Sequence, residues 1–185
     1  GGGAHHAHAD KGHGFCVYND VAVAIRLLRR DGFAGSVLIV DTDAHQGDGN
    51  HAIFAGDPTV FTYSMHGHGL FPPKVSGDLD RVLPRGAGDD ALLAALREDL
   101  RVALERAQPD LIVHVAGADV LADDPLGNLH VTLEGLLRRD LFVASVAWRR
   151  AIPLVEVLAG GYGKHAALAQ SRAVQALLRG EHRQR

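Results

Sequence analysis

The 185-residue sequence has a single cysteine, Cys16. No internal disulfide can form, so scaffolds held together by disulfide bonds are excluded. A lone cysteine is typical of a reducing compartment, and we expect a cytoplasmic protein. Strong charge of either sign is also lacking, because the formal net charge is -3 at pH 7. No overall field would steer the chain towards nucleic acid or an anionic membrane, and we expect neither as a partner.

Long apolar runs are missing as well. No stretch is long enough to span a bilayer, and no signal peptide is recognisable. The length suits one domain with a substantial core. Because the first residue is Gly1 rather than methionine, we expect a fragment whose N-terminal part is absent. Histidine, in contrast, is abundant, with 12 residues that lie mostly beside glycine or aspartate.

Short apolar runs alternate with segments of helical periodicity along the chain. The runs predict strands at residues 36–41, 59–64, 111–115 and 153–158. The periodic segments predict helices at residues 21–30, 89–107, 132–149 and 164–179, the first capped by Asn19, and a helical turn at 51–55. Residues 65–88 are expected to form a long loop. Such alternation predicts a three-layer α/β/α fold with a mainly parallel sheet.

The expected helices and the C-terminal end also allow predictions of which side chains are buried and which are exposed. Trp148 and the leucine stripes are expected in the core. The arginine pairs at 29–30, 138–139 and 149–150 are expected on solvated helix faces, and the basic cluster at 179–185 is expected to be a frayed tail.

The polar residues after the first expected strand indicate chemistry. Asp41, Asp43, His45 and Asp48 lie within eight residues, among glycines. Asp43 and His45 are two apart, so in an extended segment both side chains point the same way. A carboxylate and an imidazole are good ligands for Zn²⁺ or Fe²⁺. Three acids so close together repel one another and need a cation nearby.

Other polar residues follow the remaining strands. Ser64 and His66 end the second strand or follow it, Asp119 follows the third, and Tyr162 follows the fourth. The carboxyl ends of parallel strands share one edge, where open sheets bind ligands. Asp119 therefore completes a candidate metal triad with Asp43 and His45. Taken alone, Asp119 is more simply explained as a helix cap.

The adjacent pair His5 and His6 lies in a glycine-rich loop. Such a pair is more often solvated than functional. Here Asp41 and Asp48 are not needed by the metal, and each could accept a hydrogen bond from one histidine. That bond would fix the imidazole tautomer and raise its basicity, as a general base requires.

Tyr162 follows two glycines, so its hydroxyl lies on a flexible turn. It could pack on the end of the sheet or donate a hydrogen bond to a developing oxyanion. Phe15 and Phe71, also in loops, could be core aromatics or the walls of a narrow apolar slot.

Five pieces of the sequence resemble the histone deacetylase family of zinc-dependent deacylases, with its bacterial and acetylpolyamine-cleaving relatives. In chain order they are Gly-Gly-Gly-Ala-His-His, Gly-Phe-Cys-Val-Tyr-Asn-Asp, residues 41–49, Ala-Gly-Ala-Asp with residues 124–127, and Gly-Gly-Tyr. They cover nearly the whole chain. The triple glycine before the histidines is more similar to the class IV and bacterial branch than to other branches.

The resemblance implies an arginase-like fold in which residues 1–185 are a single deacetylase catalytic domain without its N-terminal part. It implies Zn²⁺ or Fe²⁺ held by Asp43, His45 and Asp119. It also implies a structural potassium ion near Asp41, Asp43, His45, Ser64 and Met65.

Catalytic roles are implied in the same way. His6 is similar to the family's general base and His5 to its electrostatic partner. Asp48 and Asp41 are similar to the acids behind His6 and His5. Tyr162 matches the tyrosine that stabilises the transition state.

A substrate tunnel is implied by the remaining matches. Phe15 and Phe71 are similar to the walls of an acyl-lysine tunnel, and Gly14 lies at its inner end. Gly160 and Gly161 are similar to substrate-binding glycines beside the tyrosine.

Several functions stay open at this point. The first is metal-dependent hydrolysis of N-acyl-lysine side chains, and the second is hydrolysis of acetylpolyamines or other small amides. The third is a non-catalytic acyl-lysine binder or an inactive fragment. An arginase-type ureohydrolase would need ligands for two metal ions, whereas the sequence offers one triad.

Overall fold

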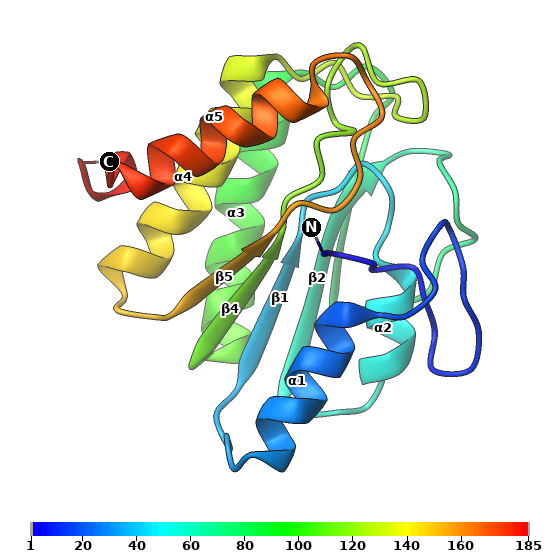
Figure 1. The fold of residues 1–185 in the computed structure, drawn as a ribbon, viewed down its shortest axis with the longest axis vertical. Coiled ribbons are helices and arrows are strands. Elements are labelled where there is room, and N and C mark those ends of the chain that lie inside the picture. Colours follow the sequence, from blue (N-terminus) through cyan, green and yellow to red (C-terminus); the bar gives the residue numbers. More distant parts are fainter. Residues whose placement is uncertain (1, 185) are drawn as a thin grey trace.

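In the computed structural model, which describes residues 2–184, five parallel strands form one sheet in the order β3-β2-β1-β4-β5. Four of them correspond to the expected strands: β1 (Val37–Asp41), β2 (Val60–Gly67), β4 (Leu111–Val115) and β5 (Leu154–Val157). One face of the sheet carries α1 (Asp20–Arg30) and α2 (Asp48–Phe54), and α3 (Asp89–Ala107), α4 (Leu133–Arg149) and α5 (Ala166–Leu178) lie on the other side (Figure 1). The predicted three-layer α/β/α fold is confirmed.

Strand β1 lies in the middle of the sheet, and all five of its residues are buried. Leu38 and Val40 pack among leucines of α3, whereas Val37 and Ile39 pack with α1 residues such as Ile25. Helices on both faces of a parallel sheet demand this continuous apolar run in place of alternation. The rigid central strand fixes the position of Asp41 at its carboxyl end.

Two helices, α1 and α4, begin at a capping side chain. Asn19 accepts a hydrogen bond from the backbone nitrogen of Ala22 at 2.8 Å, and Thr132 caps α4 through the nitrogen of Gly135 at 3.0 Å. Helix α2 begins at Asp48, three residues earlier than the turn expected at 51–55. None of the helices within residues 2–184 combines the length and apolar character needed to cross a bilayer.

The prediction of a long loop at residues 65–88 is wrong. Strand β2 continues to Gly67, and β3 (Leu79–Leu83) pairs in parallel with it. Strand β3 lies at the edge of the sheet and is only partly buried. An edge strand needs no continuous apolar run. Because β3 contains the polar residues Asp80 and Arg81, a search for apolar runs does not predict it.

The assignment of Arg139 to a solvated helix face is also wrong, because its side chain is 0% exposed. Its Nη1 donates hydrogen bonds to the carbonyl oxygens of Thr42 at 3.1 Å and Gly117 at 2.7 Å, and its Nε pairs with Asp140 at 2.7 Å. One buried guanidinium thus joins the loops that follow β1 and β4.

Two further expectations fail at the C-terminal end. Trp148 is 53% exposed and not in the core, and the guanidinium of Arg183 lies 4.5 Å from its ring centroid. The expected frayed tail contains a short 3₁₀ helix, η1 (Glu181–Gln184), which packs against α4. The indole supports this short helix from the surface of α4.

We expect Arg139→Met to lower the free energy of unfolding by about 3–5 kcal/mol, because the buried Asp140 carboxylate and two carbonyl oxygens lose their partner. Urea denaturation measures the change. The neighbouring half-buried Arg138 is the matched control, and Arg138→Met should cost about 0.5 kcal/mol or less. Equal effects of the two substitutions would contradict a structural role for Arg139.

Candidate active site

The carboxyl ends of the strands bring the expected site residues to one edge of the sheet. Asp43 and His45 follow β1, and Asp119 follows β4. The N-terminal loop crosses the same edge and is tied to it by backbone hydrogen bonds. The nitrogen of Ala159 donates to the Gly2 carbonyl at 2.9 Å, and the His5 carbonyl accepts from the nitrogen of Asn50 at 3.2 Å.

Asp43, His45 and Asp119 converge, and their ligand atoms all lie within 4.8 Å of one another. Nδ1 of His45 is 3.2 Å from Oδ1 of Asp43 and 2.8 Å from Oδ2 of Asp119. The three residues are 1%, 9% and 0% exposed. Two carboxylates and one imidazole, sheltered from water and open on one side to a cavity, form a donor set suited to Zn²⁺ or Fe²⁺.

Backbone groups hold the two carboxylates in place. The nitrogen of Gly160 donates to Oδ2 of Asp43 at 2.9 Å, and that of Ala44 donates to Oδ1 of Asp119 at 2.8 Å. A Cβ at Gly160 would lie 2.7 Å from Oδ2 of Asp119 and 2.8 Å from Oδ2 of Asp43. Glycine therefore leaves the space beside the carboxylates free, which supports the fit of a metal ion.

The electrostatics of this cluster favour a cation. Burial opposes ionisation of Asp43, but the charge of His5 and the hydrogen bond with His45 hold its pKa well below the usual range. Burial and the neighbouring charge of Asp43 raise the pKa of Asp119. Although burial lowers the pKa of His45, its bonds to Asp119 and Asp43 raise that pKa to about 10. Positive charge is thus strongly stabilised between the two acids.

The adjacent histidines each face one acid. Nδ1 of His5 donates to Oδ2 of Asp41 at 2.7 Å, and Nδ1 of His6 donates to Oδ1 of Asp48 at 2.6 Å. The two imidazole rings lie 4.0 Å apart between centroids, and both are nearly buried. Each acid therefore orients one ring. Nε2 of His5 lies 3.7 Å from Oδ1 of Asp43.

The two histidines differ in their charge. Burial lowers the pKa of His5, but the negative charges of Asp41 and Asp43 outweigh it and raise the value to about 10. For His6, burial lowers the pKa, and the charge of His5 acts in the same direction, while Asp48 opposes both. A charged His5 beside a neutral His6 is the protonation pattern that a base needs.

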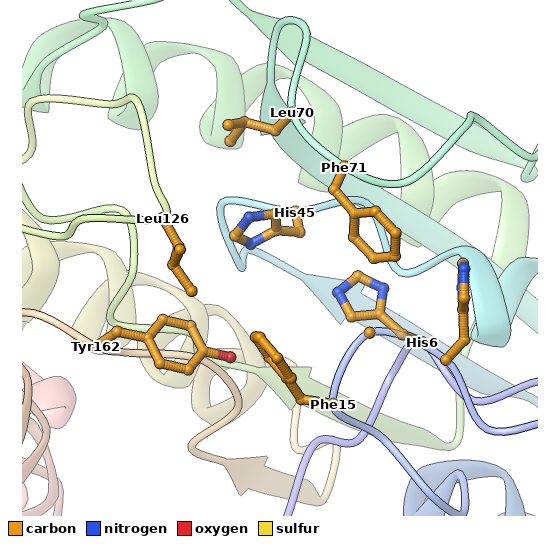
Figure 2. Close-up of a pocket in the computed structure, with 9 residues that line it drawn as sticks. His6, Phe15, His45, Leu70, Phe71, Leu126 and Tyr162 are labelled. Atoms are coloured by element: carbon orange, nitrogen blue, oxygen red, sulfur yellow. The ribbon is translucent and has the colours of Figure 1, made fainter.

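A cavity of about 440 Å³ opens above these groups. His6 and His45 line it, with Phe15, Phe71 and Leu126 on its sides (Figure 2). Phe15 is 85% exposed and Phe71 is 46% exposed, so these aromatics line the cavity and are not core residues. The volume and apolar walls are typical of a small-molecule or side-chain pocket.

Gly14 and Tyr162 border the same cavity. A Cβ on Gly14 would lie 2.7 Å from Cγ of His6, and its φ of +50° also favours glycine. The Tyr162 hydroxyl points into the cavity (Figure 2). Burial, together with the charges of Asp43 and Asp119, raises the pKa of Tyr162 to about 12, so the phenol keeps its proton near neutral pH.

Asp124 holds the turn that carries the tyrosine. Its Oδ2 accepts hydrogen bonds from the nitrogens of Tyr162 at 2.6 Å and Gly163 at 3.0 Å, and its Oδ1 accepts from that of Leu126 at 2.9 Å. Gly161, with φ of +150°, lets the chain turn before the tyrosine. The sequence marked Asp124 only as part of a motif, because nothing local reveals a partner 38 residues away.

Sequence reasoning missed two residues that surround the site. His8 and His13 both bond to Asp48, at 3.0 Å each. Gln46 does not belong to the metal cluster. Its side-chain Nε2 donates to the Val75 carbonyl oxygen and its Oε1 accepts from the Val75 backbone nitrogen, at 2.9 Å each. The histidine-rich loop is a signal for His8 and His13, although spacing alone does not indicate which acid they meet.

The residues expected around a potassium ion lie on two neighbouring strands and on the loop that follows β1. Asp41 of β1 is paired with Ser64 of β2, next to Met65, and the Ser64 hydroxyl accepts from the nitrogen of Gly47 at 3.3 Å. Their proximity is consistent with a shared site. The potassium ion itself stays a prediction.

Residues 1–178 match the family model described as the histone deacetylase domain. The chain belongs to the histone deacetylase family. It is 46% identical over 165 residues to an uncharacterized protein of Picosynechococcus sp., covering 89% of this chain and 55% of that protein. It is 34% identical over 183 residues to histone deacetylase 2 of Arabidopsis thaliana, covering 97% and 47%. The resemblance found in the motifs is confirmed.

A solved structure supports the same relationship. The fold matches the crystal structure of acetylpolyamine aminohydrolase from Burkholderia pseudomallei with a TM-score of 0.81 and 29% sequence identity. The match covers 93% of this chain and 52% of that one. The deacetylase-like fold class is therefore confirmed, and the chain spans about half the length of the curated relatives that it matches.

We expect Gly160→Ala to weaken Zn²⁺ binding at the Asp43–His45–Asp119 cluster at least about tenfold, since the new methyl group would press on both carboxylates. Competition with a chelator measures the affinity of the site that binds Zn²⁺ most tightly, which we expect to be this cluster. Gly88→Ala is the matched control, because a Cβ there meets only the His130 carbonyl at 3.5 Å. Unchanged affinity in Gly160→Ala would contradict the assignment of the ligands.

Proposed function

We propose that this chain carries the catalytic site of a metal-dependent hydrolase that cleaves the amide bond of N-acyl-lysine side chains. The proposal is carried by one observation: His6, His45 and Tyr162 line one apolar cavity, and each of the two histidines is bonded to the buried acids behind it. Membership of the histone deacetylase family supports amide hydrolysis as the reaction class.

The metal would be held by Asp43, His45 and Asp119. When bound, it would act as a Lewis acid on the amide carbonyl and lower the pKa of a water molecule. Burial of the three ligands keeps competing water away from the carboxylates. We infer that the potassium ion expected near Ser64 would stiffen the loop that carries two of these ligands.

His6 acts as the general base in this scheme. Its Nδ1 is occupied by Asp48, which leaves Nε2 to take the proton of the attacking water. The neighbouring His5 stays charged and stabilises negative charge that develops during the attack. The protonated His6 then delivers a proton to the leaving amine, as microscopic reversibility allows.

Tyr162 donates a hydrogen bond to the developing oxyanion. Its raised pKa keeps the hydroxyl protonated, and its direction into the cavity aims the donor at a bound carbonyl (Figure 2). Asp124 fixes the backbone on which the tyrosine stands. A donor fixed in advance loses little energy to reorganisation during the reaction.

The cavity walls suit the four-methylene arm of lysine. The rings of Phe15 and Tyr162 lie 5.9 Å apart between centroids, and Phe71 lies 5.3 Å from His6. An alkyl chain between such aromatic walls buries apolar surface at about 25 cal/mol per Å². The polar amide would then meet the polar groups at the cavity floor.

Hydrolysis of acetylpolyamines is the second candidate. It is favoured by the structural similarity to the acetylpolyamine aminohydrolase of Burkholderia pseudomallei. A polyamine arm has the same width as a lysine arm and differs mainly in the charges further along the chain. The third candidate, a non-catalytic acyl-lysine binder, would use the same cavity without turnover.

Hydrolysis of a substrate panel separates these functions. We expect the purified protein, loaded with Zn²⁺ or Fe²⁺, to remove the acyl group from acyl-lysine peptides and leave the free lysine amine. A chelator should abolish the activity, and added metal should restore it. Turnover of acetylpolyamines alone would favour the second candidate. If the protein binds the peptides but holds no metal and shows no turnover, only the non-catalytic acyl-lysine binder is left.

We expect Tyr162→Phe to lower kcat by about 10²- to 10³-fold, because it removes one oxyanion donor. The change in KM should be small, since the ring still lines the cavity. Tyr18→Phe is the control, because Tyr18 is 80% exposed and does not line this cavity. Unchanged kcat in Tyr162→Phe would refute the role of the hydroxyl.

A further inference from the structure

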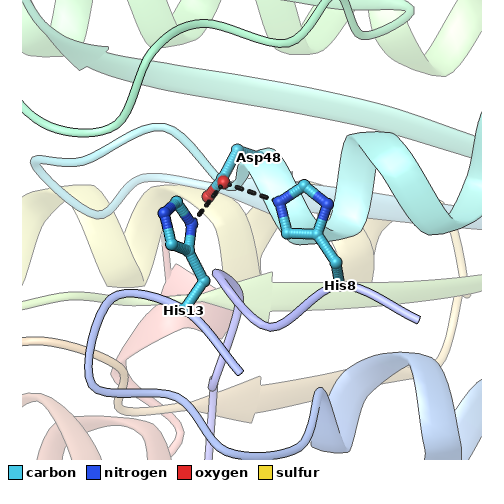
Figure 3. Close-up of side chains that lie close together, drawn as sticks. All are labelled: His8, His13 and Asp48. Carbon is cyan, nitrogen blue, oxygen red and sulfur yellow. Dashed lines mark hydrogen bonds and ion pairs between the residues drawn. The ribbon is translucent and has the colours of Figure 1, made fainter. Parts of the chain in front are cut away.

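A second group of potential ligands lies on the other side of His6. Nε2 of His8 and Nδ1 of His13 each lie 3.0 Å from Oδ2 of Asp48 (Figure 3). One ligand atom from each of the three residues lies within 4.8 Å of the other two. The other oxygen of Asp48 accepts the hydrogen bond from His6, so the carboxylate bridges this group and the catalytic histidine.

The spacing of the three atoms suits a transition-metal ion. Two ligands at about 2.0–2.1 Å from a tetrahedral Zn²⁺ are separated by about 3.3 Å. The separations of 3.0 Å at Asp48 are within a few tenths of an ångström of that value. The rings of His8 and His13 are 5.6 Å apart and nearly perpendicular, at 77°, so neither ring blocks the other. Small side-chain rotations would turn the hydrogen bonds into coordination bonds.

The local chain brings the two histidines together. The nitrogen of His8 donates to the Lys11 carbonyl at 3.0 Å, and His13 exchanges two backbone hydrogen bonds with Cys16 at 2.8 Å each. The intervening residues therefore form a compact loop in which both rings face Asp48 at the start of α2 (Figure 3).

The site is accessible to an ion. The side chains of His8 and His13 are 17% and 29% exposed, whereas that of Asp48 is 2% exposed. A buried carboxylate thus anchors two rings that reach solvent. A fourth position facing solvent would be open to water, as in zinc sites with three protein ligands.

A third cluster among residues 2–184, formed by His114, Asp140 and Glu156, does not offer the same possibility. Arg139 already supplies positive charge there by pairing with Asp140 at 2.7 Å, and Glu156 pairs with His114 at 3.0 Å. No such cation pairs with Asp48 among the described residues, where only imidazole rings reach its carboxylate.

We propose that His8, His13 and Asp48 form a second binding site for a divalent transition-metal ion of the Zn²⁺ class, separate from the Asp43–His45–Asp119 cluster. The rings of His13 and His45 lie 6.4 Å and 6.0 Å from that of His6, so the two sites flank this histidine.

Occupancy of the second site has a consequence that rests on the proposed hydrolase function. An ion draws Oδ2 of Asp48 into its coordination shell, and the same carboxylate orients the His6 ring through Oδ1. His13 also lines the catalytic cavity, so its ring moves with the ion. Excess Zn²⁺ therefore slows turnover by displacing the groups that position the base.

Metal stoichiometry tests the site independently of activity. Protein without a histidine tag is dialysed against micromolar Zn²⁺ and analysed for bound metal. We expect His8→Ala with His13→Ala to bind one equivalent fewer than the unmodified protein, and each single change to weaken the second site at least about tenfold. His130→Ala, at an exposed histidine outside the three clusters, should bind the same amount as the unmodified protein.

Equal amounts of bound Zn²⁺ in the double variant and the unmodified protein would overturn the proposal. His8, His13 and Asp48 would then be a hydrogen-bonded cluster and not a metal site. Circular dichroism shows whether the variants are folded. If the variants are not folded, NMR of the unmodified protein tests the proposal instead. The imidazole resonances of both His8 and His13 must shift when Zn²⁺ is added beyond one equivalent.

An activity measurement then tests the consequence. The ratio of turnover with and without excess Zn²⁺ should fall in the unmodified protein and stay near one in His8→Ala. Absence of any turnover would contradict the proposed hydrolase function and leave the stoichiometry result standing. A second equivalent bound without any change in that ratio would limit the proposal to binding.

Discussion

The repulsion between two buried carboxylates, Asp43 and Asp119, governs how the groups around them are arranged. They come from loops after different strands and meet with almost no exposed surface. Two neighbouring buried acids are tolerated only if positive charge and hydrogen-bond donors surround them. The nearby His45, the backbone nitrogens of Ala44 and Gly160, and a metal ion when bound all serve this requirement.

The surrounding structure holds these loops from two sides. From behind, the buried Arg139 links the carbonyl oxygens of Thr42 and Gly117, which lie beside the ligand loops. From the front, the N-terminal loop is tied down by His5 on Asp41 and His6 on Asp48. The interactions that position the proposed catalytic groups are therefore also interactions that stabilise the fold. A site built this way is organised before any substrate arrives.

Much of the fold could be predicted, because its signals are local. The run Val37–Asp41 is a central strand by its apolar character, and α3 matches its expected bounds, Asp89–Ala107. Strand β3 escaped prediction because an edge strand needs little apolar surface. Trp148 was misplaced because an indole can cover a surface as well as fill a core, and only the position of η1 decides which.

The layers, the parallel sheet and the edge at which Asp43, His45 and Asp119 meet can be predicted from the amino-acid sequence, because periodicity and the order of strands and helices are properties of short segments. The folded chain alone reveals that His8 and His13 share Asp48 and that Arg139 is buried. These contacts join residues that are about 20 to 100 positions apart, and no local pattern specifies which distant partner a polar side chain will find.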